Sequence, residues 1–274
     1  MICVEGAKKH FTSGVLRKHL VKAVDGVSFS IKPGETFGLV GESGCGKSTL
    51  SRLILRLLPL DSGKIFFEGE DISNYNYREM LRLRRNMQII FQHPDAALNP
   101  RHSIQESFVE PIRLHKLMKP RQEQNKISEL LEVVGLNEEL LNRYPHQVSG
   151  GQLQRIALAR VLTMHPKFLV LDEPTSMLDV SVQAQILNLL LEVQEKYNLA
   201  YLFISHDLEV VKFMSNQIGV MYQGKIVELT NSDEIFKKPR HPYTKKLADA
   251  FTFFNKQGFS KEERENITKK RVMA

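Results

Sequence analysis

The sequence predicts an α/β fold in which helices cover a largely parallel sheet. Short apolar runs of strand length alternate with longer segments that carry apolar residues at helical spacing. Residues 168–171 are apolar throughout, as expected for a strand buried on both faces of a parallel sheet. Residues 103–142 lose this strand character, which indicates a helical segment inserted into the α/β core.

In the first half of the chain, five short apolar runs are expected to form strands. These are residues 2–4, 27–31, 36–40, 64–72 and 87–91. A Pro33-Gly34 turn precedes the third of them. Residues 47–58 carry leucine and isoleucine at helical spacing, and Pro59 is expected to end that helix.

In the second half, Ser149 is expected to begin a helix that cannot continue past Pro166. The later elements are a strand at 168–171, a helix at 183–197, a strand at 200–205 and a hairpin of 218–221 with 225–229. We therefore expect one domain, in which residues 1–92 and 161–230 form the core. Residues 93–160 would form a helical subdomain and residues 231–274 a C-terminal extension.

Composition places the chain among ordinary globular proteins, with 274 residues, 42% hydrophobic and 25% charged. No apolar run reaches the roughly 18 residues that a membrane span needs, and the N-terminus lacks the order of a secretion signal. Two cysteines are too few for a disulfide framework, which favours a reducing cytoplasm. The net charge of +7 includes a basic tail at 255–274 with interleaved acids, so we expect no nucleic-acid partner.

A glycine-rich loop after the strand at 36–40 predicts a binding site for a nucleoside triphosphate. Gly41, Gly46, Lys47 and Ser48 satisfy the pattern G-x-x-x-x-G-K-S, in which backbone N–H groups cradle phosphate at a helix N-terminus. Lys47 would neutralise the β- and γ-phosphates, and the Ser48 hydroxyl would ligate Mg²⁺. The candidate ATP-binding residues of this phosphate loop are Gly41, Glu42, Ser43, Gly44, Cys45, Gly46, Lys47, Ser48 and Thr49.

Cys45 is expected to serve mainly as a small residue of this loop. Its place at a helix N-terminus would lower the pKa of its thiol and so leave a reactive cysteine as the alternative.

Two acids follow the buried strand at 168–171. Asp172 would stand at the carboxyl end of that strand, near the phosphates, as a partner of Mg²⁺. Glu173 would polarise the water that attacks the γ-phosphate, a role that contributes roughly 10²–10⁴-fold in rate.

Six spaced motifs resemble those of ABC-transporter ATPase subunits, over residues 2 to about 250. Besides the phosphate loop, Ser149-Gly-Gly-Gln152 resembles the signature, and residues 168–175 resemble the Walker B segment. Gln92, Asp179 and His206 resemble the Q-loop glutamine, the D-loop aspartate and the switch histidine. The resemblance implies a P-loop NTPase core of RecA-like type, with an antiparallel β lobe and the inserted helical subdomain.

The resemblance also implies a mechanism in which two cassettes pack head to tail around ATP and Mg²⁺. Each ATP would then lie between one phosphate loop and the partner's signature, which is Ser149, Gly150, Gly151 and Gln152 in this chain. The implied catalytic residues are Glu173, His206, Gln92 and Lys47. Glu173 would polarise the attacking water, and His206 would hold this water and the γ-phosphate. Gln92 would also ligate Mg²⁺, and Asp179 would contact the partner. Phe11 is expected to stack on adenine, with His10 as the alternative.

Three further stretches narrow the resemblance to the ATPases of dipeptide, oligopeptide and nickel importers. They are residues 93–101, 143–146 and 239–244. The implied partners are two permease subunits, a second and paralogous ATPase, and an extracytoplasmic solute-binding protein, with the chain at the cytoplasmic face of the membrane.

The cargo stays open between peptides and nickel or metal chelates. A soluble ABC protein of ribosomes or DNA, an exporter ATPase and a stand-alone kinase are the weaker alternatives. The first usually carries two cassettes or large insertions and does not account for residues 239–244. Exporters often fuse the cassette to membrane helices, and a kinase would leave the signature without a purpose.

Overall fold

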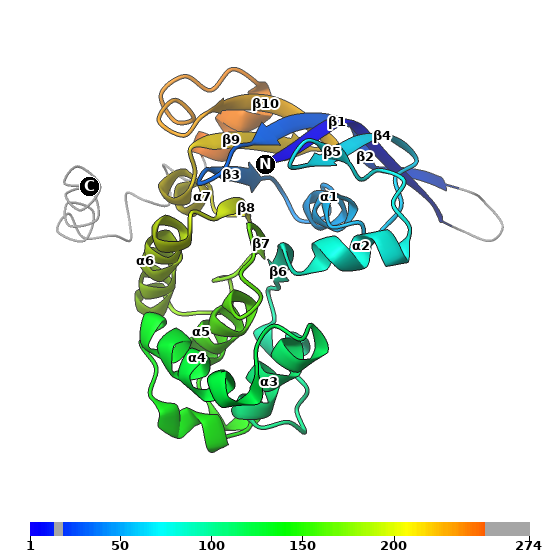
Figure 1. Ribbon diagram of the computed structural model, residues 1–274. Helices are drawn as coiled ribbons and strands as arrows, with labels where there is room; N and C mark the ends of the chain where they lie inside the picture. Colours follow the sequence, from blue (N-terminus) through cyan, green and yellow to red (C-terminus); the bar gives the residue numbers. More distant parts are fainter. Residues whose placement is uncertain (14–18, 250–274) are drawn as a thin grey trace.

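A six-stranded, mostly parallel sheet forms the centre of the computed structural model, which describes residues 1–13 and 19–249 (Figure 1). The strand order is β10-β9-β3-β8-β7-β6. The strands are β3 (Thr36–Val40), β6 (Met87–Ile90), β7 (Phe168–Asp172), β8 (Ala200–Ser205), β9 (Gln217–Tyr222) and β10 (Lys225–Asn231). β10 pairs antiparallel with β9, while the other described pairs in this sheet are parallel. The predicted α/β class is confirmed.

A second, antiparallel sheet lies at the upper right in Figure 1, in the order β2-β1-β4-β5. Its strands are β1 (Ile2–Ser13), β2 (His19–Ile31), β4 (Ser62–Phe67) and β5 (Glu70–Asp71). The prediction of one strand over 64–72 is wrong, because the chain turns back at Glu68 and Gly69, whose φ values are 50° and 87°. Two successive residues with positive φ are typical of a tight hairpin turn.

Seven helices named in Figure 1 accompany the two sheets. They are α1 (Lys47–Ile54), α2 (Tyr77–Arg84), α3 (Ile104–Leu114), α4 (Pro120–Val133), α5 (Gly150–Leu162), α6 (Val180–Tyr197) and α7 (Leu208–Met214). Short 3₁₀ turns occupy Pro94–Ala97, Glu138–Asn142 and Pro145–Gln147, and residues 242–249 are helical. In Figure 1, α3, α4 and α5 lie at the opposite end of the molecule from the antiparallel sheet.

Two helix ends differ from the predicted ones. α1 ends at Ile54 rather than at residue 58, because Arg56 adopts a left-handed conformation with φ 53°. α6 begins at Val180, three residues before the predicted start, because the Asp179 carboxylate caps it by accepting the Val182 N–H at 2.9 Å.

Alternate residues of the central strands belong to two hydrophobic clusters on opposite faces of the sheet. Leu169 and Leu171 belong to one cluster, and Phe168 and Val170 belong to the other. The first cluster continues into the inserted helices through Ile104, Phe108 and Ile127, all fully buried. α5 also crosses the predicted subdomain boundary at residue 160. Within the described residues, no helix combines the length and apolar character that crossing a bilayer requires.

Candidate nucleotide-binding site

A cleft of about 650 Å³ opens where the phosphate loop, the carboxyl ends of β6 and β7, and the antiparallel sheet meet. Its volume falls within the range of small-molecule sites. Predicted site residues form most of its lining, namely Ser43, Gly44, Cys45, Gly46, Lys47, Ser48, Thr49, Gln92, Asp172 and Glu173. The structure therefore brings together residues that are as much as 130 positions apart in the chain, from Ser43 to Glu173.

The phosphate loop connects β3 to α1 and takes its shape from glycine. Gly46 is the N-cap of α1 and has φ 114°, a region that residues with a side chain rarely adopt. A Cβ atom on Gly46 would lie 2.0 Å from the carbonyl oxygen of Ala23. The loop therefore passes close to β2, and the first residues of α1 line the cleft, where the positive end of the helix dipole favours an anion.

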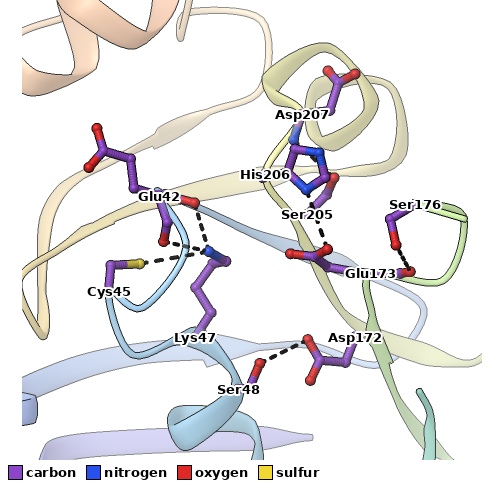
Figure 2. Close-up of polar contacts among 11 residues, drawn as sticks. Glu42, Cys45, Lys47, Ser48, Asp172, Glu173, Ser176, Ser205, His206 and Asp207 are labelled. Carbon is purple, nitrogen blue, oxygen red and sulfur yellow. Dashed lines mark hydrogen bonds and ion pairs between the residues drawn. The ribbon is translucent and has the colours of Figure 1, made fainter. Parts of the chain in front are cut away.

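The Lys47 side chain is buried inside the phosphate loop. Its Nζ donates hydrogen bonds to the carbonyl oxygens of Gly41 at 2.7 Å and Glu42 at 2.9 Å. Figure 2 shows the contact with Glu42. The ammonium group is therefore held at the floor of the cleft, where a phosphate would meet it.

Cys45 is also buried, and burial raises the pKa of its thiol above the ordinary value, although Lys47 acts in the opposite direction. The expectation that the helix N-terminus lowers this pKa is wrong, because desolvation outweighs the nearby positive charge. Cys45 is thus a small loop residue with little thiolate character.

Ser48 and Asp172 approach each other across the base of the cleft. The Ser48 hydroxyl donates to Asp172 Oδ1 at 3.3 Å (Figure 2). Burial raises the pKa of Asp172, the hydrogen bond from Ser48 lowers it, and the charge of Glu173 raises it again. A divalent cation between this hydroxyl and this carboxylate would relieve the desolvated charge, so the pair fits Mg²⁺. In the described chain, no group of three or more His, Cys, Asp and Glu side chains forms a ready-made metal site.

Glu173 and His206 form the second polar pair of the site. Glu173 Oε2 and His206 Nδ1 lie 3.3 Å apart, and the Glu173 side chain is 20% exposed against 60% for His206. Glu173 has φ 51°, a turn that directs its side chain toward His206 at the end of β8, as drawn in Figure 2. Gln92 reaches the same cleft from the end of β6. A carboxylate and an imidazole therefore stand together beside the phosphate loop.

The signature residues lie elsewhere. Ser149, Gly150, Gly151 and Gln152 begin α5, and none of them lines the cleft described above. Ser149 Oγ accepts the Gln152 N–H at 3.3 Å, while Gln152 Oε1 accepts the Ser149 N–H at 3.0 Å, which completes a capping box. A Cβ on Gly151 would lie 2.6 Å from Val182, so close packing on α6 requires this glycine. Asp179 is likewise outside the cleft, at the start of α6.

Phe11 lies in β1, opposite Val21 of β2, and does not line the cleft. Its ring is 40% exposed, and the ammonium of Lys9 lies 5.7 Å from the ring centroid. Sequence reasoning missed the side of the cleft formed by Leu20, Val21, Lys22, Ala23, Gln223 and Gly224. The unusual exposure of Leu20 and Val21, at 61% and 50%, becomes visible only in the fold.

These observations define a class of protein, the P-loop nucleoside triphosphatases. In this member a second glycine-rich helix N-terminus, at the start of α5, lies outside the cleft that the phosphate loop lines. Comparison with known proteins agrees with this class. The ABC transporter family matches residues 24–176, and the C-terminal region of oligopeptide/dipeptide transporters matches residues 227–271.

Similar proteins come from several bacteria. The oligopeptide transport ATP-binding protein AppF of Bacillus subtilis is 49% identical over 262 residues, which cover 94% of this chain and 80% of AppF. OppF of the same organism is 51% identical over 249 residues, covering 90% of this chain and 81% of OppF. The dipeptide transport ATP-binding protein DppF of Lactococcus lactis is 49% identical, covering 84% of this chain and 75% of DppF.

Solved structures resemble most of the fold. A component of an ABC transporter complex from Clostridium perfringens has a TM-score of 0.76 and 30% identity, and the match covers 86% of this chain and 90% of that one. A dimeric bacterial ABC transporter cassette also has a TM-score of 0.76, with 27% identity and coverage of 85% and 99%. The chain belongs to the ABC transporter family, as one of its ATP-binding subunits. Within that family it belongs with the oligopeptide and dipeptide proteins, and it is an ATPase coupled to transport.

Proposed function

We propose that this chain hydrolyses ATP to drive the import of peptides through a membrane permease, by ATP-dependent pairing of two cassettes. One observation carries the proposal most directly. The signature at the start of α5 exposes Ser149 and Gly150 to solvent, outside the cleft that holds the phosphate loop. A helix N-terminus with exposed glycine N–H groups is suited to an anion, and a second cassette would bring one there.

The surface beside the signature supports this pairing. Met177 and Val180, on either side of Asp179, are 64% and 59% exposed although both are apolar. A second cassette that packed there would bury them and would meet the Asp179 carboxylate. ATP would then bind between the two chains and favour the closed pair by its differential affinity.

The polar residues predicted at the site divide the work of the proposed hydrolysis. Lys47 and the loop N–H groups would bind the phosphates, and Ser48, Asp172 and Gln92 would hold Mg²⁺. The bound cation would offset charge on the β- and γ-phosphates. Glu173 would take a proton from the attacking water, and His206, 3.3 Å away, would orient that carboxylate and contact the γ-phosphate.

Adenine would lie toward the antiparallel sheet. Phe11 remains the proposed stacking residue, and it belongs to the same strand pair as the cleft residue Val21.

The proposed assembly contains two permease subunits, a second and paralogous cassette, and an extracytoplasmic solute-binding protein. This chain would be peripheral, at the cytoplasmic face of the membrane. Relatives named for oligopeptide and dipeptide transport, and the oligopeptide/dipeptide match at residues 227–271, support peptides as the cargo. Nickel or a metal chelate is the second cargo that the sequence predicts.

A tagged Glu173→Gln variant tests the proposal. The variant should bind ATP without hydrolysing it, so the closed assembly should persist in detergent extracts that contain Mg-ATP. Mass spectrometry of the purified material should then identify two multispanning permeases and a second cassette. A co-purifying binding protein can be titrated directly with peptides and with nickel, which decides the cargo.

Glu195→Gln is the matched control, because it removes the same charge from an exposed position of α6. This control should hydrolyse ATP normally and should not accumulate the closed assembly. Recovery of ribosomal or DNA-repair proteins with Glu173→Gln would refute the transport role. A variant that stays monomeric at saturating ATP, alone and with its partners, would refute the pairing mechanism.

A further inference from the structure

A tyrosine from the C-terminal extension reaches the phosphate loop. The hydroxyl oxygen of Tyr243 accepts a hydrogen bond from the backbone N–H of Glu42 at 3.0 Å, across 201 positions of sequence. The Tyr243 side chain is buried, and its ring packs on that of Tyr222 with 4.4 Å between centroids. Neither Glu42 nor Tyr243 lines the cleft, but the contact lies next to Ser43, the first residue of the loop that does.

Glu42 is held on both sides of its Cα atom. Its N–H group donates to the Tyr243 hydroxyl, and its carbonyl oxygen accepts from Lys47 Nζ at 2.9 Å. The tyrosine is therefore connected through a single residue to the ammonium group that the phosphates require. A shift of the Glu42 backbone would therefore move the carbonyl oxygen that holds the Lys47 ammonium group, together with the N–H group that Tyr243 holds.

The protein fixes Tyr243 itself by a buried carboxylate. Glu228 of β10, only 7% exposed, accepts the backbone N–H groups of Arg240 at 3.0 Å and His241 at 2.8 Å. Burial opposes ionisation, but the N–H groups of His241 and Arg240 hold the pKa of Glu228 below its ordinary value. His241 Nδ1 in turn accepts the Tyr243 N–H at 3.2 Å. These bonds anchor the start of the helix at 242–249 to the central sheet.

The other end of the loop has a separate support. The Gly224 N–H, in the turn between β9 and β10, donates to the Cys45 carbonyl at 3.0 Å. Loss of the tyrosine hydroxyl would therefore release the Glu42 end and leave the Cys45 end attached. The effect should be local to the first turn of the loop rather than a loss of the fold.

We propose that Tyr243 is a positioning residue for ATP binding, and that its hydroxyl preorganises the phosphate loop from the C-terminal extension. The inference rests on the proposed ATP site and adds a determinant of its affinity. A loop that is already ordered loses less freedom when the phosphates bind, so removal of the support should weaken binding. The chemical step involves Glu173 and His206, which this contact does not touch.

Tyr243→Phe is the direct test, because it removes the hydroxyl and keeps the ring against Tyr222. Tyr222→Phe is the matched control, since its hydroxyl accepts from Gln223 in the turn between β9 and β10 and not from the backbone of the phosphate loop. Hydrogen exchange of the Glu42 amide should be about 3- to 10-fold faster in ligand-free, full-length Tyr243→Phe. The Kd for ATP should rise by a similar factor, while kcat at saturating ATP changes less than about twofold. Tyr222→Phe should change neither exchange nor affinity.

The two readouts separate this inference from the proposed function. Exchange in the ligand-free protein tests the contact without any nucleotide, and a rate equal to wild type would overturn the inference. Faster exchange with an unchanged Kd would also overturn it, because the contact would then be structural only. Wild-type protein that fails to bind ATP would refute the proposed function itself and the positioning role with it.

Discussion

Replacing Gly46 by alanine is expected to destabilise the ligand-free protein more than the same change at Gly44. Both glycines belong to the phosphate loop and both have positive φ, 114° and 81°, so both variants bear the cost of placing a side chain in that region. This shared cost is about 1–2 kcal/mol. The surroundings differ, because a Cβ on Gly46 would meet the Ala23 carbonyl oxygen at 2.0 Å, whereas a Cβ on Gly44 has no neighbour within 4 Å.

The new Cβ atom at position 46 is fixed by the loop backbone, and the Ala23 carbonyl oxygen is fixed by β2. No rotation of a side chain can therefore relieve this contact. Overpacking of this kind adds about 1–3 kcal/mol, which gives about 2–5 kcal/mol for Gly46→Ala against about 1–2 kcal/mol for Gly44→Ala. In a chain of this size the difference corresponds to roughly 2–5 °C in the unfolding midpoint. Thermal melts of both variants without nucleotide, followed by far-ultraviolet circular dichroism, measure it. Equal unfolding midpoints for the two variants would show that β2 moves to accommodate the new methyl group and that the steric argument is wrong.

Two further predictions concern protonation. The Cys45 thiol should react with a disulfide reagent at neutral pH much more slowly than a free cysteine, because burial raises its pKa; a rate that matches the unfolded chain would contradict this. Asp172→Asn should raise the unfolding midpoint of the ligand-free protein at pH 7, because burial raises the pKa of the carboxyl and the ionised form opposes folding. For such a raised pKa, wild-type stability is greater below the ordinary value of 3.8 and falls as pH rises through the folded value, so the advantage of the variant should shrink in acid. A lower unfolding midpoint for Asp172→Asn than for wild type at pH 7 would refute this expectation. Added Mg-ATP should stabilise wild type far more than the variant.

Local patterns were sufficient to predict most of the residues that line the cleft. The phosphate loop is continuous in sequence, and Asp172 and Glu173 follow directly from a strand that is apolar on both faces. Parallel pairing of β7 and β8, together with that of β8 and β3, brings the carboxyl ends of these strands together. The meeting of Glu173 with His206 is thus a consequence of topology that the order of strands already implies.

Other features depend on packing that a local pattern does not encode. The split of residues 64–72 into β4 and β5 depends on the conformations of Glu68 and Gly69, which neighbouring apolar residues conceal. The low reactivity expected of Cys45 follows from burial, whereas its sequence position indicated the opposite shift in pKa. The contact of Tyr243 with Glu42 joins residues 201 positions apart, and neither residue belongs to the other's motif in the sequence.

The bonds that Lys47 makes in the ligand-free protein affect how nucleotide leaves the site. In the proposed ATP complex, a phosphate would accept from the ammonium group, which has three N–H donors and already donates to the carbonyl oxygens of Gly41 and Glu42. When product departs, these carbonyls would still accept from the lysine, so no buried charge would be left without a partner. Release would therefore not leave the ammonium group unpaired. A chain that must complete many rounds of turnover benefits from a site whose empty state is as well satisfied as its occupied one.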